Sequence, residues 1–118
     1  MSDEAKWAAQ NGDLEKLKNA CSEPGFDINA DVGMGRALIH CAADYGQKDV
    51  LEYLIGIGAN VNAVDKHGIT PLLNAIFEGH TTSVALLLEK GADKSVKAPS
   101  GESAYASAEK DEIKKLLE

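Results

Sequence analysis

The chain has 118 residues and a formal net charge of −7, from 19 acidic and 12 basic residues. This length is typical of one domain, and the acidic balance argues against direct nucleic-acid binding, which needs clustered Lys and Arg. We expect no membrane span and no secretory signal, because no apolar run is long enough for either, and we expect Cys21 and Cys41 to be free thiols in a reducing compartment.

Residues 1–30 predict a helical hairpin. The segment from Ala8 to Leu17 has the pattern of a helix end, a turn at Gly12 and a second helix. The loop at residues 21–26 carries one residue more than the matching loops later in the chain. After this loop, the segment at residues 27–30, DINA, corresponds to the segment at residues 60–63, NVNA, in the next unit.

The two central segments repeat each other with a fixed period. Gly35, Gly68 and Gly101 lie 33 residues apart, and the segments that follow the first two of these glycines align with each other. A period of this length predicts stacked repeats that share a continuous core, with no single closed core.

Both central repeats carry the signals of two short helices. Thr70 and Pro71 suit the N-cap and the first position of a helix, and Gly79 suits the left-handed residue that ends one. The apolar residues of 50–55 and 84–88 recur at three- and four-residue spacing. We therefore expect each second helix to bury one face.

Residues 97–118 predict a shortened fourth unit. The segment 109–118 is rich in Lys and Glu, which suits a terminal repeat whose outer face meets water. The predicted fold class is therefore all-α, a solenoid with two full repeats, 31–63 and 64–96, between two capping repeats, 1–30 and 97–118. Because both ends are capped against further stacking, we expect a monomer.

The repeat resembles the ankyrin repeat, in which T-P-L-H-x-A-A opens the first helix and Gly-Ala-Asp or Gly-Ala-Asn ends the second. The segments ITPLLNA, from Ile69, and LIHCAA, from Leu38, match this pattern, although Ala37 and Leu38 replace the usual Thr and Pro. The resemblance implies an ankyrin-repeat solenoid that binds other proteins. It also implies that the turns and first helices form the concave side.

This implied geometry places aromatic residues on the concave side. Three of the chain's aromatic residues, Trp7, Tyr45 and Phe77, fall there. Aromatic anchors surrounded by charge are typical of an interaction patch. The alternatives are that Trp7 seals the N-terminal cap, and that Tyr45 and Phe77 pack beneath the neighbouring turn. We also expect Cys41 and Asn74, which correspond to Trp7 in register, to point outward.

Acidic residues surround these aromatic positions in the predicted geometry, at Asp31, Asp44, Asp65 and Glu78. They favour a partner with a basic patch, although acidity also serves solubility alone. The candidate protein-binding residues, all on turns or first helices, are Trp7, Met34, Arg36, Asp44, Tyr45, His67, Phe77 and Glu78.

The histidines favour structural roles over catalysis. His40 occupies the motif position where the ankyrin family uses the ring for hydrogen bonds between turn and helix, and we expect His80 to be structural as well. His67 lies on a turn tip and is a candidate contact. No histidine has metal-site spacing to another histidine or a cysteine, and no serine has a nucleophile setting. We therefore predict no enzyme activity, metal or cofactor.

Longer matches narrow the resemblance to a subgroup of small, stand-alone ankyrin-repeat proteins. They include DKHGITPLL, from Asp65, and the segments 11–14, 38–44 and 90–97. The loop at 23–26 departs from the subgroup, as does the turn that contains Gly33 and Met34.

The subgroup resemblance implies a function. It implies that the protein binds the heterodimeric actin-capping protein and keeps it off filament barbed ends, with an acidic concave surface covering the basic residues that hold actin. The alternative is regulation of Rel-type transcription factor dimers, whose basic segments also suit an acidic groove. Either function predicts a cytoplasmic protein small enough to enter the nucleus, and neither involves a membrane.

Overall fold

The structure is a computed structural model that describes residues 2–118. These residues form eight α-helices and no extended strand, which confirms the all-α prediction. The helices are α1 (Ser2–Asn11), α2 (Leu14–Cys21), α3 (Leu38–Asp44), α4 (Lys48–Gly56), α5 (Pro71–Phe77), α6 (Thr81–Glu89), α7 (Ala104–Ser107) and α8 (Asp111–Leu117). No helix within residues 2–118 has both the length and the hydropathy of a membrane span.

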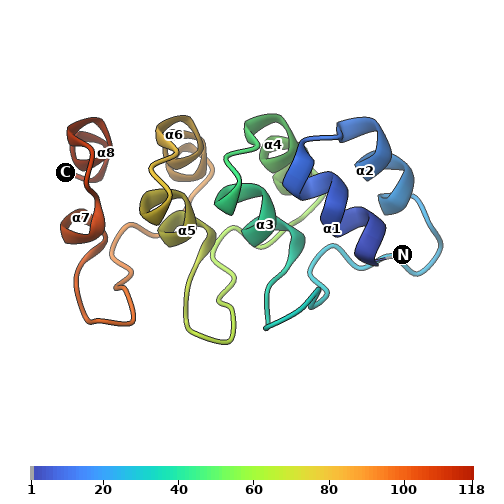
Figure 1. The fold of residues 1–118 in the computed structure, drawn as a ribbon, viewed down its shortest axis with the longest axis horizontal. Helices are drawn as coiled ribbons and strands as arrows, with labels where there is room; N and C mark the ends of the chain where they lie inside the picture. The colour runs from blue at the N-terminus through green and yellow to red at the C-terminus, as the bar shows by residue number, and fades with distance from the viewer. Residues whose placement is uncertain (1) are drawn as a thin grey trace.

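The helices form two parallel rows. Figure 1 shows α1, α3, α5 and α7 in one row and α2, α4, α6 and α8 in the other, with long turns extending beyond the first row. Each helix packs on its hairpin partner and on the neighbouring helix of its own row. The result is an elongated molecule with extents of 41 × 24 × 20 Å.

Small residues in the first row let the helices approach one another closely. Ala8, Ala42 and Ala75 occur at matching positions of successive repeats, and each is fully buried. The second row supplies the large side chains of the core, including Leu54 and Leu87, which are also fully buried. The predicted amphipathic second helices are therefore confirmed, and the core runs continuously along the stack.

Local helix signals act as the sequence predicts. The Thr70 hydroxyl accepts a hydrogen bond from the backbone N–H of Leu73 at 3.3 Å, which caps the start of α5. Gly46 and Gly79 end α3 and α5 with φ angles of 67° and 71°, in the left-handed region that only glycine adopts without strain.

A side chain crosses each of the three junctions between repeats. It belongs to the N-cap residue of a second helix and reaches a carbonyl near the end of the preceding unit's first helix. Gln47 Nε2 donates to Gln10 O at 2.9 Å, His80 Nε2 to Asp44 O at 3.0 Å, and Lys110 Nζ to Gly79 O at 2.8 Å. These bonds fix the register of adjacent repeats, and they confirm the structural role expected for His80.

Candidate functional site

The candidate site lies on the side built from the turns and the first-row helices, here called the concave side. Trp7 projects from α1, Tyr45 follows α3, and Phe77 ends α5. Their exposed fractions are 50%, 52% and 44%, so all three rings are accessible and none fills the core. Because α1, α3 and α5 are successive neighbours in one row, the three rings are distributed along the stack.

The structure corrects one expectation about this surface. Cys41 is fully buried and Asn74 is nearly so, although both were expected to point outward like Trp7. The physical reason is their place in the stack. Helices α3 and α5 have a neighbouring first helix on each side, whereas α1 has a neighbour on one side only. The same register position is therefore covered in the two central repeats and open in the first.

Asp44 is paired within the chain. Its Oδ2 lies 3.5 Å from Arg36 Nη2, and the same guanidinium nitrogen lies 3.4 Å from the carbonyl oxygen of His40, to which it donates. Both charged side chains are about three-quarters covered, with exposed fractions of 24% and 28%. Arg36 therefore neutralises part of the Asp44 charge, so the two candidate contact residues form one unit.

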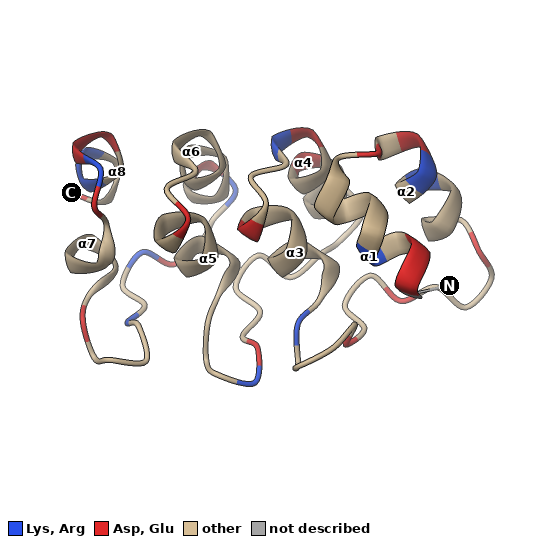
Figure 2. Ribbon diagram, in the orientation of Figure 1, with Lys and Arg blue, Asp and Glu red and all other residues tan. Residues whose placement is uncertain are grey.

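Glu78 is the freer of the two candidate carboxylates. It is exposed at the C-cap of α5. Among the residues that the structure describes, the one salt bridge joins Arg36 to Asp44, and Glu78 forms none. Figure 2 shows acidic residues at the ends of α3 and α5, and a basic residue beside an acidic one at the tip of the turn between α4 and α5.

Asp31 and Asp65 organise the turns that contain them. Asp31 Oδ1 accepts hydrogen bonds from the backbone amides of Gly33 and Gly35 at 2.7 and 3.1 Å. Asp65 repeats this arrangement one unit later, at 2.8 and 3.0 Å. One oxygen of each carboxylate is thus committed to its own turn, which makes these residues mainly structural.

The tip of the turn at residues 31–36, which precedes α3, has an unusual backbone. Met34 has a φ of 59°, which non-glycine residues seldom adopt, and its side chain is 58% exposed. Its carbonyl accepts a hydrogen bond from the backbone N–H of Lys66 at 2.9 Å, so successive turn tips are joined. A Cβ on Gly35 would lie 2.7 Å from that same nitrogen, which explains why glycine is needed there. Met34 is therefore displayed on a fixed loop.

His40 joins its own helix to the following turn. Its Nδ1 accepts from the backbone N–H of Ala37 at 3.0 Å, and its Nε2–H donates to the carbonyls of Ala63 and Ile69, at 3.0 and 3.1 Å. The ring is completely buried. The predicted structural role is confirmed, and His40 is removed from the set of groups that a partner can reach. His67, in contrast, is exposed at a turn tip.

This burial makes stability depend on pH. Burial lowers the pKa of His40 below its ordinary 6.5, and backbone hydrogen bonds offset this only in part. Unfolded chains therefore bind a proton at His40 more readily than folded ones. The stabilising contribution is fully present above about pH 6.5 and is lost as the pH falls from there towards the lowered pKa of the folded protein.

We expect the urea midpoint of unfolding to fall between pH 7 and pH 5. The variant His40→Gln should be less stable and should lose part of this pH dependence, because its side chain has no proton to bind. His67→Gln, a matched change at an exposed histidine, should keep the wild-type slope. A wild-type slope in His40→Gln would show that His40 is not the titrating group.

The described residues offer little for catalysis or metal binding. Within residues 2–118, no group of three or more His, Cys, Asp or Glu side chains is placed to hold a metal ion. Cys21 and Cys41 are free thiols, and burial raises the pKa of both, which favours the protonated thiol. What this surface presents is exposed aromatic rings, a strained methionine and charge, which are means of binding a protein.

Comparison with known proteins gives consistent results. The family model for ankyrin repeats in three copies matches residues 6–98. Myotrophin of Xenopus tropicalis is 53% identical over 111 residues, which cover 94% of this chain and 93% of myotrophin. BCL-6 corepressor-like protein 1 of Homo sapiens is 33% identical over 110 residues, which cover 93% of this chain but only 6% of that protein.

A solved structure shows the same fold. The complex of the predatory endopeptidase Bd0816 from Bdellovibrio bacteriovorus with the immunity protein Bd3460 contains a chain that matches with a TM-score of 0.90. The match covers 97% of the present chain and 61% of that chain, at 23% sequence identity. At this identity the likeness extends to the fold alone.

Proposed function

The chain belongs to the ankyrin-repeat family and within it to the myotrophin-like proteins, and on this premise we propose that it sequesters the heterodimeric actin-capping protein. It is a protein-binding ankyrin module. The observation that carries the proposal is the 53% identity to myotrophin, which extends over nearly the whole of both chains. The resemblance of the chain to this subgroup implies that it binds capping protein and so keeps it off the barbed ends of actin filaments.

The charges of the concave side support this partner. The resemblance implies that capping protein holds actin through basic residues, and the present chain carries a net charge of −7. Glu78 is exposed and without an ion pair in the described structure, and Asp44 retains part of its charge beside Arg36. Complementary charge accelerates encounter and fixes the orientation of two proteins.

The shape of the site supports a mechanism by competition. Trp7, Tyr45 and Phe77 act as apolar anchors, and Met34, Arg36 and His67 contact the partner from the turns. The hydrogen bond between Met34 O and Lys66 N holds the turn tips in place before binding. A rigid surface loses little entropy on association, and a standard interface of about 1,600 Å² suffices to cover the actin-binding residues. We place this activity in the cytoplasm.

Actin elongation measures the proposed function directly. Pyrene-labelled actin is elongated from barbed ends in the presence of capping protein, with increasing amounts of the purified chain. We expect the chain to restore elongation in a dose-dependent manner. Unchanged inhibition of growth, at chain concentrations far above that of capping protein, would exclude the proposal. Affinity capture from lysate tests the alternative, since recovery of Rel dimers without capping subunits would favour transcriptional regulation.

Charge reversal at Glu78 should act mainly on the rate of association. The variant Glu78→Lys places a positive charge against the basic partner, so we expect slower association and a weaker dependence on salt. Stopped-flow binding at two or more salt concentrations measures both effects. Glu89→Lys makes the same change at an exposed position of α6, in the second row, and should behave closer to wild type. Equal slowing by both variants would mean that only net charge matters.

A further inference from the structure

A lysine from the second helix covers the indole ring of Trp7. The ammonium nitrogen of Lys16 lies 5.0 Å from the centroid of the ring, within the range of a cation–π interaction. Trp7 belongs to α1 and Lys16 to α2, and these two helices pack against each other as a hairpin. The contact therefore joins the exposed anchor to the scaffold of the first unit.

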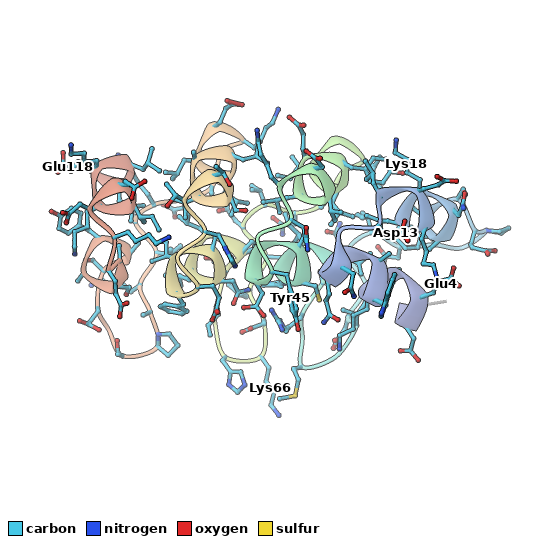
Figure 3. The ribbon with its side chains drawn as sticks, turned by 45° about the horizontal axis from the view of Figure 1, so that its top comes forward. Glu4, Asp13, Lys18, Tyr45, Lys66 and Glu118 are labelled. Atoms are coloured by element: carbon cyan, nitrogen blue, oxygen red, sulfur yellow. The ribbon has the colours of Figure 1, made fainter. Side chains whose placement is uncertain are left out.

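The lysine faces the ring although carboxylates lie close by. Glu4, Asp13 and Glu15 line the same surface depression as Lys16, and Figure 3 shows Glu4 and Asp13 beside the first two helices. In the described part of the chain, none of them forms a salt bridge with Lys16. Asp13 instead accepts a hydrogen bond from the backbone N–H of Lys16 at 3.0 Å, as the N-cap of α2.

The N-cap bond fixes the backbone from which the lysine side chain extends. Lys16 is the third residue of α2, so capping by Asp13 holds its backbone at a defined angle to α1. The backbone of Trp7 is held in turn by α1, where its carbonyl also accepts from Asn11 Nδ2 at 2.8 Å. Two anchored backbones thus set the positions from which the ammonium group and the ring meet.

We propose that Lys16 is a positioning residue that orients Trp7 for its partner and determines which kind of partner group the ring can contact. This inference rests on the proposed function. An indole held in one orientation loses less freedom on binding than a mobile one, so the clamp preorganises the anchor. Because one face of the ring already carries a cation, a positively charged partner group is repelled there. On the face of the ring that Lys16 covers, the partner segment that contacts Trp7 is therefore apolar or anionic.

The candidate contact residues are consequently divided in their chemistry. At the ends of α3 and α5, Asp44 and Glu78 suit basic groups of the partner. At α1, Lys16 and Trp7 suit an apolar group with or without a negative charge. A partner that presents both kinds of group in the right order fits in one orientation only, which supplies specificity beyond the attraction of opposite net charges.

Fluorescence tests the clamp without any partner, because Trp7 is the one tryptophan of the chain. Quenching by iodide and by caesium ions reports the local charge at the indole. The quantity compared between variants is the ratio of iodide to caesium quenching. In Lys16→Met the ratio of iodide to caesium quenching should fall by about 2-fold or more, since the cation is absent, and in Lys16→Arg it should stay near the wild-type value.

Lys18→Met is the matched control. Lys18 lies on the same helix and its ammonium group is 5.4 Å from the ring of Tyr53, so its removal makes the same charge change without touching Trp7. We expect the wild-type quenching ratio in this variant. A ratio in Lys16→Met that equals that of Lys18→Met would overturn the proposed orientation of Trp7 by Lys16.

Binding to purified capping protein tests the positioning role. Lys16→Met should weaken binding by about 2- to 5-fold, and Lys16→Arg should restore it. Wild-type affinity in Lys16→Met would overturn the positioning role even if the quenching ratio changes. If the wild-type chain itself fails to bind capping protein, the proposed function is wrong, and the quenching ratio still decides whether Lys16 holds Trp7.

Discussion

Replacing Leu54 with alanine is expected to lower the free energy of unfolding by about 2–5 kcal/mol. Leu54 is fully buried on α4, the second helix of a central repeat, which packs against both α2 and α6. Truncation removes apolar contacts and leaves a cavity that rigid neighbouring helices fill only in part. In a stacked array each repeat is stabilised by its neighbours, so a defect here weakens two interfaces at once.

Urea denaturation followed by circular dichroism measures this loss. The matched control is Leu116→Ala, because Leu116 is a leucine on the last second-row helix whose side chain is 37% exposed. A surface change of this kind is expected to alter stability by about 0.5 kcal/mol or less. If both variants lost the same stability, the continuous core between the two rows would not be what holds the repeats together.

Replacing Trp7 with alanine is expected to weaken binding to capping protein by about 2 kcal/mol or more, which is roughly 30-fold in the dissociation constant. Trp7 is half exposed in the free protein, so truncation removes a large apolar contact from the interface and little from the core. The folded structure should therefore persist. Calorimetric titration with capping protein gives the affinity, and the pyrene-actin assay gives the matching loss of inhibition.

Tyr105→Ala provides a control of similar chemistry. Tyr105 is 44% exposed on α7 and also carries a lysine over its ring, with Lys114 Nζ at 4.8 Å. It lies in the last repeat, outside the proposed contact set, and its truncation should change affinity far less. Inhibition at the wild-type level by a folded Trp7→Ala protein would remove Trp7 from the interface.

The parts of the fold that the sequence predicts correctly depend on local physical chemistry. The hydroxyl of Thr70 caps its own helix, the glycines after α3 and α5 adopt left-handed backbone angles, and the apolar spacing of the second helices buries one face. The role of His40 also follows from its place in the ankyrin motif. Each of these features is specified within one repeat, or by a period that recurs in all of them.

The errors and omissions arise where one repeat meets another. Cys41 and Asn74 share a register position with Trp7, yet neighbouring first helices bury them and leave Trp7 open. The pairing of Arg36 with Asp44 has no pattern in the sequence, because residues eight apart are joined only when a turn folds back on its helix.

The sequence by itself determined the helical repeats, the Thr70 cap, the stacking period and an acidic binding module of the ankyrin class. Only the tertiary structure decided which side chains are free to bind. Glu78 is exposed without an ion pair in the described residues while Asp44 is paired with Arg36, and Lys16 covers one face of Trp7. The physical reason is that helix propensity and period are properties of nearby residues, whereas exposure and charge pairing depend on side chains that approach through space.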